Sequence, residues 1–199
     1  MMRKNKFVLL IFGAVCLAIV NFSCTNGSKP ADVEAQSAKL TGEELVVRGE
    51  YLVTIMGCND CHSPKQMGAN GPELIPELLL SGYPGDRPIL DLKTEMTAQG
   101  FATFYPDLTG SAGPWGMSFA ANLTPDATGI GTWSEEQFKK AMKEGKFKGL
   151  DGTRKLLPPM PVENFKDIKD EDISAIFAYL KSLPPVKNVV PAAIPPGEQ

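Results

Sequence analysis

The stretch MGCNDCHSPK contains two cysteines in C-x-x-C spacing, Cys58 and Cys61, followed directly by His62, the only histidine of the 199-residue chain. Cysteines this close together serve several kinds of site: a disulfide, a zinc centre, a thioredoxin-like redox pair, or the covalent attachment of haem. Each kind of site requires a different environment in the rest of the protein. The remaining sequence therefore decides which chemistry the motif supports.

The C-x-x-C-H motif favours haem over the three alternatives. A structural zinc site takes about four ligands, usually in two separated Cys or His pairs, and the chain has no second pair. A thioredoxin-like pair expects a βαβ context, whereas this motif follows a segment with helical periodicity. A disulfide leaves His62 without a role. We therefore predict thioether bonds from Cys58 and Cys61 to one haem c, with His62 as the proximal iron ligand.

A six-coordinate iron needs a second axial ligand, and methionine is the natural candidate because the chain has no other histidine. The candidates are Met56, Met67, Met96, Met117, Met142 and Met160. Met160 lies between prolines in LLPPMPVENF, and their restricted backbone leaves the loop little entropy to lose when it presents the sulfur to iron. We predict Met160 as the ligand, with Met117 as the main alternative.

The N-terminus is organised like an export signal. Three basic residues precede an apolar run from Phe7 to Val20, which is shorter than the roughly 20 residues of a membrane span. The serine before Cys24 resembles the lipobox of bacterial lipoproteins, in which the cysteine is lipidated and becomes the mature N-terminus. Simple secretion and a retained anchor helix are the alternatives. We predict a signal peptide over residues 1–23, a lipidated Cys24 and a flexible tether over residues 24–40.

Export changes the charge balance of the chain. The full sequence has 20 basic and 23 acidic residues, and residues 1–23 hold three basic and no acidic ones, so the mature chain carries a net charge of about −6. Nucleic acid is therefore not an expected partner. We predict a protein on the periplasmic side of a membrane, held to the membrane surface by its lipid anchor.

Three segments show the periodicity and end signals of helices. Thr41 and Glu44 have capping-box spacing at the start of the first, TGEELVVRGEYLVTIMG. Ser134 and Gln137 have the same spacing in the second, WSEEQFKKAMKEGK. The third, KDEDISAIFAYLKSLPP, has acidic residues in its first turn and prolines at its end. Residues 63–132 show little sustained periodicity and no strong strand alternation.

The order helix, C-x-x-C-H, loops, helix, methionine loop and terminal helix resembles the class I cytochromes c, which carry a single haem. The stretches NLTPDATGIGTWSEEQFKKAMKEGK and PPMPVENFKDIKDEDISAIFAYLKSLPPV are similar to c-type domains of bacterial respiratory chains and dehydrogenase-associated cytochromes. The resemblance covers roughly residues 41–62 and 119–187. It implies an all-α cytochrome c fold over residues 41–187, with three to five helices around one covalently bound haem.

The resemblance also implies roles for residues outside the motif. A glycine on the first helix, here Gly49, lets the last helix cross it closely. Either of two aromatic residues of the last helix would meet it, Phe177 or Tyr179. The proximal histidine of the family donates its second ring N–H to a proline carbonyl, for which Pro72 is the best match. The alternatives are Pro64 and Pro114. A tryptophan before the middle helix, here Trp133, hydrogen-bonds a haem propionate in relatives.

The chain departs from the minimal family pattern by a long insertion, residues 65–118, between the haem motif and the middle helix. Its aromatic residues could cover a haem edge or form a small satellite core. These residues are Phe101, Phe104, Tyr105 and Trp115. We expect the satellite core, and an extended tail over residues 188–199.

These features predict a one-electron carrier rather than an enzyme, which relays electrons between a redox protein donor and acceptor. An alternative from a different class is a haem-based gas sensor or a peroxidase-like enzyme, which would need an open iron site. A third possibility is an electron-transfer subunit of a larger dehydrogenase or oxidase.

Overall fold

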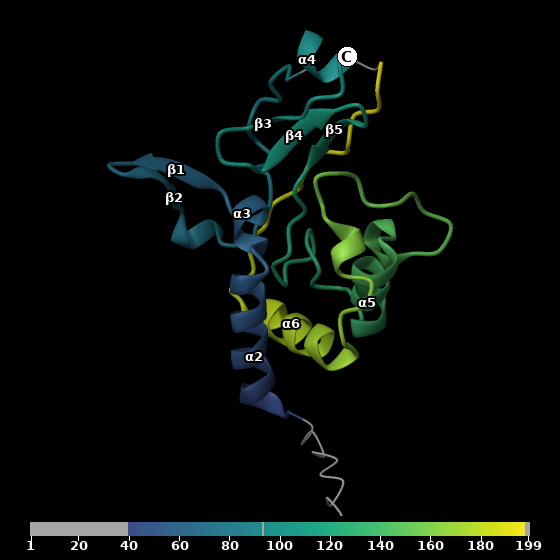
Figure 1. Cartoon of the computed structure of the whole chain (residues 1–199). Coiled ribbons are helices and arrows are strands. Elements are labelled where there is room, and N and C mark those ends of the chain that lie inside the picture. The colour runs from purple at the N-terminus through teal and green to yellow at the C-terminus, as the bar shows by residue number, and fades with distance from the viewer. Residues whose placement is uncertain (1–39, 93, 198–199) are drawn as a thin grey trace, which may run out of the picture. The chain divides into compact units, whose positions relative to one another are not determined.

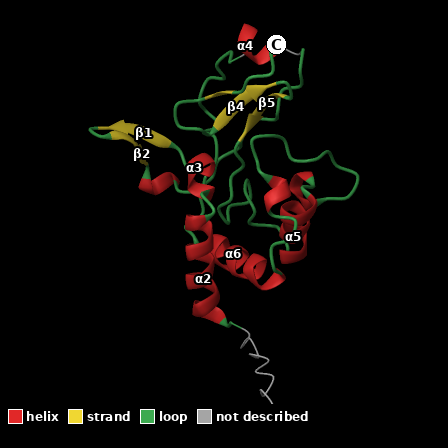
Figure 2. Ribbon diagram, in the orientation of Figure 1, coloured by secondary structure: helices red, strands yellow, loops and turns green. Residues whose placement is uncertain are grey.

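The structure, a computed structural model, describes residues 40–92 and 94–197. The predicted signal peptide, Cys24 and the tether up to residue 39 lie outside the described residues. Within the described part, five α-helices and two small antiparallel sheets are present (Figures 1 and 2).

Three of the helices are those that the sequence predicts. The helices are α2 (Gly42–Ile55), α3 (Cys58–His62), α4 (Glu95–Ala98), α5 (Glu135–Glu144) and α6 (Asp170–Ser182), with 3-10 turns at Pro76–Leu78, Phe147–Gly149 and Val162–Asn164. The predicted end signals also act as expected: the Glu44 carboxylate accepts the Thr41 N–H at 3.3 Å, and the Ser134 hydroxyl accepts the Gln137 N–H at 3.1 Å. The helix α3 carries the C-x-x-C-H motif, and α4 lies in the insertion.

All five strands of the described residues lie between residues 65 and 119. They are β1 (Lys65–Gly68), β2 (Gly71–Leu74), β3 (Thr103–Phe104), β4 (Gly110–Gly113) and β5 (Gly116–Phe119). The first two form a hairpin with Met67 opposite Pro72, and the other three form a sheet in the order β3-β4-β5. The all-α expectation is therefore only partly correct. Strands of two to four residues are too short to show the alternation that indicates a strand in a sequence.

The helices α2 and α6 cross in close contact (Figure 1). A Cβ atom on Gly49 would lie 2.0 Å from the Ala175 carbonyl oxygen and 2.7 Å from the Tyr179 Cβ, so only a glycine fits this crossing. The predicted contact with Tyr179 is confirmed. Phe177 instead stacks against Phe138 of α5, with ring centroids 5.3 Å apart.

One apolar cluster, the main core, joins α2, α5 and α6. Its buried members are Leu52, Val53, Leu80, Ile130, Phe138, Met142, Ile173, Ala175, Ile176 and Leu180. Leu80 and Ile130 come from the loops that precede α5, so these loops are fixed on the helices rather than free of them.

A second cluster, the satellite core, lies within the insertion. Its buried members are Tyr83, Tyr105, Ala112 and Met117. The satellite core is therefore present as expected and includes Tyr105. Phe101 and Phe104 are exposed, and Trp115 donates its indole N–H to Ser118 Oγ at 3.2 Å, so these three aromatic side chains are not its members.

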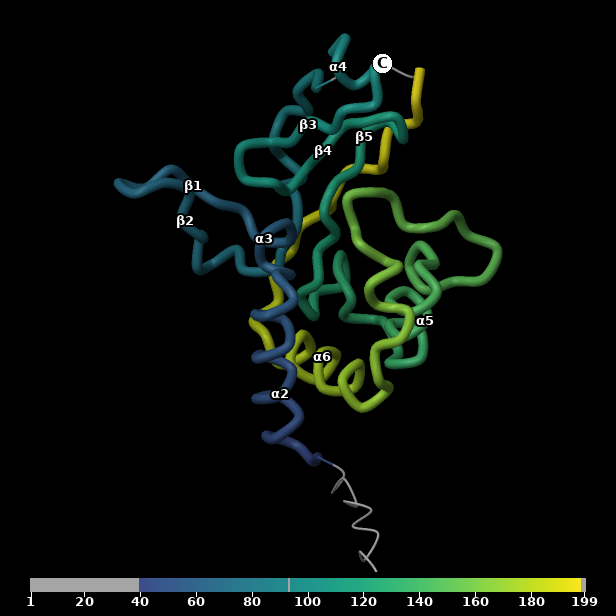
Figure 3. The backbone as a smooth tube through the Cα atoms, in the orientation of Figure 1, coloured from purple at the N-terminus to yellow at the C-terminus, as the bar shows by residue number. Residues whose placement is uncertain are grey.

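The C-terminal tail completes the satellite core. Val190 and Ile194 pack against it, and Ile194 exchanges two backbone hydrogen bonds with Met117 of β5, at 2.8 and 3.0 Å. The tail follows β5 in the trace (Figure 3). Residues 83–119 and 190–194, far apart in sequence, thus form one packed unit.

Candidate haem-binding site

A sharp turn at Gly57 separates the first helix from the haem motif. Gly57 has a φ of 68°, a left-handed conformation that glycine adopts without strain, and it lies between the end of α2 and the start of α3. The following helix α3 places Cys58 and Cys61 three residues apart, on one side of a single turn. His62 is the last residue of the same turn. Both thiols are free and half-buried.

The two thiols are not activated as redox nucleophiles. Burial raises the pKa of Cys58 to about 11, and burial also raises the pKa of Cys61. Thioredoxin-like pairs work through a thiolate whose pKa is lowered. The thiol environment therefore argues against the redox-pair interpretation of the motif.

The imidazole of His62 is oriented by a backbone carbonyl. Its Nδ1 lies 2.8 Å from the Ala121 oxygen. Because a carbonyl can only accept, Nδ1 carries the proton, and the lone pair of Nε2 is left for a metal. Burial lowers the pKa of His62, although the Ala121 contact opposes this shift, and a lowered pKa favours the neutral ring. A neutral ring with a fixed tautomer is the form that binds iron.

The acceptor of the His62 proton differs from the prediction. Pro72 lies in β2, and the hairpin takes it away from this role, while the Pro64 carbonyl accepts the Ile75 N–H at 3.2 Å. The structure therefore corrects the expected acceptor from Pro72 to Ala121, which follows the whole insertion. The interaction uses only a main-chain oxygen, so no side chain in the sequence marks it.

Gly82 brings the Ala121 segment to the haem motif. Its N–H donates to the His62 carbonyl at 2.7 Å, and a Cβ at this position would lie 2.4 Å from the Ala120 oxygen. Two segments that follow the hairpin, one at Gly82 and one at Ala121, therefore contact His62. Sequence reasoning missed Gly82 as well, because glycines are common in this chain and nothing singles this one out.

Three of the residues predicted to bind the haem lie against the main core. Cys58, Trp133 and Met160 are half-buried and pack against it. The loop of Met160 is fixed by backbone hydrogen bonds: the Met160 N–H donates to Leu157, and the Met160 carbonyl accepts from Val162 at 2.9 Å. Cys58, Cys61 and His62 lie on one helical turn, and Cys58 and Met160 both pack against the main core, so together they form a donor set that fits a covalently attached haem.

The comparison with known proteins agrees with this geometry. A profile of the cytochrome c family matches residues 46–184, which is more than half of the chain. The chain belongs to the cytochrome c family. Membership confirms the predicted cofactor, a covalently bound haem c.

Relatives of this cytochrome are components of dehydrogenases. It is 33% identical over 138 residues to the gluconate 2-dehydrogenase cytochrome c subunit of Pantoea cypripedii, covering 69% of the cytochrome and 23% of the relative. It is 27% identical over 136 residues to the fructose dehydrogenase cytochrome subunit of Gluconobacter japonicus, covering 68% and 20%. A shorter match, 45% identical over 80 residues, is to one of the subunits of nicotinate dehydrogenase from Pseudomonas putida, covering 40% and 6%. The cytochrome thus spans less than a quarter of the length of these relatives.

The methionine predicted as the alternative iron ligand lies outside the main core. Met117 is 0% exposed and belongs to the satellite core, not to the main core that holds Met160. Met67 and Met96 are 75% and 53% exposed in the insertion, and Met142 is buried inside the main core. Among the described methionines, Met56 is the other one that is half-buried against the main core, and it follows α2 directly as its C-terminal cap residue.

The predicted membrane attachment of this chain concerns residues outside the described part. Among the described residues, no helix combines the length and the apolar character that a bilayer span requires. Cys24, the predicted lipid attachment site, precedes these residues in the chain.

Proposed function

We propose that this cytochrome is a one-electron carrier whose haem iron is held between His62 and Met160. The observation that carries the proposal is the shared packing of Cys58 and Met160 on the main core, together with the Ala121 contact that leaves His62 Nε2 unprotonated. Bound haem would supply a one-electron ferric–ferrous couple. Both ligands belong to segments fixed by backbone hydrogen bonds, so little rearrangement accompanies a change of charge on the iron.

The chain's own residues would orient the group and keep water from it. Trp133 is half-buried on the main core, and its indole N–H has no hydrogen-bond partner among the described residues. That free donor supports the proposal that Trp133 hydrogen-bonds a haem propionate. Cys58 and Cys61 would fix the haem through thioether bonds, which leaves His62 to ligate from the same turn.

Replacement of each candidate methionine by leucine tests the iron ligand. Met160→Leu preserves side-chain volume but removes the sulfur, so the weak far-red sulfur-to-iron absorption band of the ferric protein should disappear. The reduction potential should fall substantially, because axial ligands move haem potentials over a wide range. Met117→Leu, the matched control, should retain both the band and the potential. The opposite pattern would assign the ligand to Met117.

Carbon monoxide distinguishes the carrier from a gas sensor or a peroxidase-like enzyme. A carrier with both axial positions occupied should bind carbon monoxide poorly in its ferrous form. Met160→Leu opens one position and should bind it readily. Tight binding to the unaltered protein would contradict the carrier and favour the alternative.

The relatives support the proposal that this protein carries electrons from a dehydrogenase. Their names describe cytochrome subunits of gluconate and fructose dehydrogenases. We propose that this protein accepts electrons from a redox enzyme on the periplasmic side of a membrane, either as a free carrier or as a component of that enzyme. We propose Cys24 as the lipid anchor. Cys24→Ser should release the protein from membranes, and continued association would favour an uncleaved N-terminal helix.

A further inference from the structure

The haem-motif helix α3 needs contacts from other segments to fix its position. It has five residues, and none of them is fully buried. Helices of this length are unstable alone in water, so contacts at its ends must fix it. One such contact is made by Ser63, whose hydroxyl donates to Asn59 Oδ1 at 2.7 Å and accepts the Leu80 N–H at 2.8 Å.

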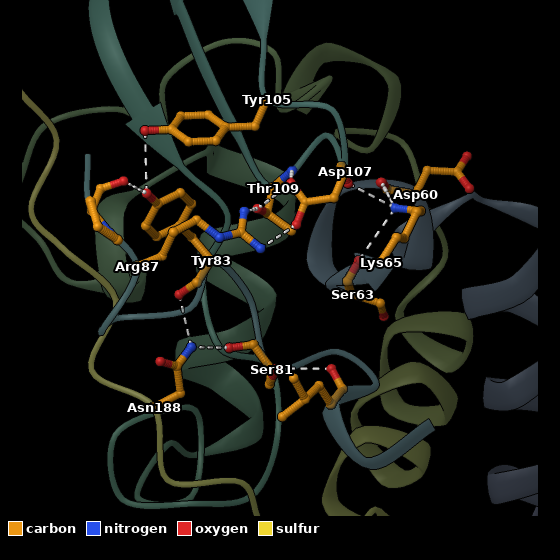
Figure 4. A network of polar contacts seen from close by, with 12 residues as sticks. Asp60, Ser63, Lys65, Ser81, Tyr83, Arg87, Tyr105, Asp107, Thr109 and Asn188 are labelled. Carbon is orange, nitrogen blue, oxygen red and sulfur yellow. Dashed lines mark hydrogen bonds and ion pairs between the residues drawn. The ribbon is translucent and has the colours of Figure 1, made fainter. Parts of the chain in front are cut away.

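Lys65 makes a second and stronger contact at the same end. Its ammonium donates to three backbone carbonyls: Asp60 at 2.6 Å, Ser63 at 3.3 Å and Asp107 at 2.9 Å (Figure 4). The first two belong to the C-terminal end of α3, where carbonyls lack helical partners and a cation is favourable. The third lies 42 residues further along the chain, in the insertion. The first side chain of the insertion therefore joins the end of the haem motif to the Asp107 segment.

The Asp107 end of this contact is itself rigid. Its side chain is 7% exposed, accepts from Arg87 at 2.7 Å and accepts from the Thr109 hydroxyl at 2.8 Å. Burial alone would raise the pKa of Asp107, but these hydrogen bonds hold the pKa below its usual value. The carboxylate is thus charged and fully bonded, which fixes the carbonyl of the same residue.

Aromatic rings of the satellite core hold Arg87 in turn. Its guanidinium lies 5.1 Å from the centre of the Tyr83 ring and 5.9 Å from that of Tyr105 (Figure 4). A cation at this distance is attracted by the negative face of an aromatic ring, most strongly where water is excluded. A continuous chain of contacts therefore runs from the satellite core through Asp107 and Lys65 to α3.

We propose that Lys65 is a positioning residue for His62, through which the insertion fixes the orientation of the imidazole and holds a cation at the end of the haem motif. The proposal rests on the function above, because it presumes His62 as an iron ligand. Lys65 holds the turn that ends in His62, so its loss would let the ring rotate about the Ala121 contact. Its positive charge also favours the ferrous form, which carries one positive charge fewer than the ferric form.

The test compares three variants of the haem-loaded protein. Lys65→Met removes the charge and all three hydrogen bonds, whereas Lys65→Arg retains a cation with several donors. Lys155→Met is a matched control, because Lys155 donates to the carbonyl of Glu144, the last residue of α5, at 2.5 Å. It removes the same chemistry from a different helix end.

Lys65→Met should lower the reduction potential and change the g values of the low-spin ferric spectrum, which depend on the orientation of the imidazole plane. It should also make the Gly82 amide, bonded to the His62 carbonyl, exchange about tenfold faster. Lys65→Arg should lie closer to the parent, and Lys155→Met should change neither the g values nor the Gly82 amide. Unchanged g values and potential in Lys65→Met, with haem attached, would overturn the positioning role.

A second variant keeps the test decisive if Lys65→Met does not fold. Arg87→Met acts on Lys65 only through Asp107, so it should shift the g values in the same direction by a smaller amount. An unchanged spectrum would overturn the proposal. Failure of the parent chain to carry haem is a different result, since it would overturn the proposed function itself.

Discussion

The main core and the satellite core are stabilised in different ways. The main core consists of helices whose apolar faces meet, and its polar pairs, such as Arg48 with Asp172 at 2.9 Å, lie at its edge. The satellite core has few apolar members and includes two buried tyrosines, whose hydroxyls lie 3.2 Å apart. Around these tyrosines, buried polar groups replace the helical packing.

Because the two cores are stabilised differently, we expect them to respond differently to substitutions. Apolar burial contributes about 25 cal/mol per Å² and is shared by all the helices of the main core, so a change in its packing lowers the stability of the whole core. A buried hydrogen-bond network depends on geometry, and loss of one member leaves the others unsatisfied. We therefore expect variants in the main core to lower global stability and variants in the satellite core to open that region locally.

Gly49→Ala should have the largest effect, because it forces α2 and α6 apart. Alanine favours an isolated helix by about 1 kcal/mol over glycine, so a purely local effect would stabilise the protein. The added Cβ would lie 2.0 Å from the Ala175 oxygen, and we expect a net loss of about 3 kcal/mol in the free energy of unfolding. Urea unfolding followed by circular dichroism measures it. Val47→Ala, an exposed change on the same helix, is the control, and a stabilising Gly49→Ala would contradict the close crossing.

The sequence predicts the two regions unequally, for physical reasons. Helical periodicity and caps at Thr41 and Ser134 are local signals, so α2, α5 and α6 could be located, and Gly49 followed from the family pattern. The satellite core depends on pairings between distant segments, such as Met117 with Ile194, which leave no local signature. For the same reason the aromatic residues expected to form it were mostly wrong.

The residues of the candidate site were also predicted only in part from the sequence. Cys58, Cys61 and His62 were found from their spacing, because covalent attachment requires those side chains in that order. The Ala121 carbonyl was missed, since any residue can supply a backbone oxygen. Lys65 was missed because a lysine after a haem motif is ordinary until its three carbonyl partners are known.

Asn188→Ala should have the next largest effect and should be local. The side chain links the tail to the insertion: its amide donates to the Ser81 and Tyr83 carbonyls at 2.7 and 2.9 Å, and its oxygen accepts the Gly85 N–H at 2.7 Å. Three lost bonds should cost about 2 kcal/mol. Hydrogen exchange should become faster at the Met117 amide and stay unchanged in α6.

Asn164→Ala is the control for this change, because its side chain makes no hydrogen bond among the described residues. Equal acceleration of exchange in α6 would mean that the tail stabilises the whole domain. The distinction between a global and a local core would then fail.

Arg87→Met should have the smallest effect on stability, but it should change the titration of the Asp107 carboxyl. Removal of the guanidinium should raise the pKa of Asp107, because burial then acts with less opposition from hydrogen bonds. A carboxyl whose pKa is lowered by folding stabilises the protein above its unfolded pKa of about 3.9, and that contribution is lost as the pH falls through the lower folded pKa. In the variant this contribution should be smaller, and its loss should be complete at a higher pH.

Carbon-13 NMR of the Asp107 carboxyl measures this shift directly. Arg48→Met, which breaks the corresponding pair of the main core, should leave the Asp107 titration as it is in the parent. If Arg87→Met also left it unchanged, the Thr109 hydrogen bonds alone would hold the carboxylate, since they contact the other oxygen. The satellite core would then contain two independent contacts at Asp107 rather than one continuous network, and the route from the tyrosines to Lys65 would be broken at Arg87.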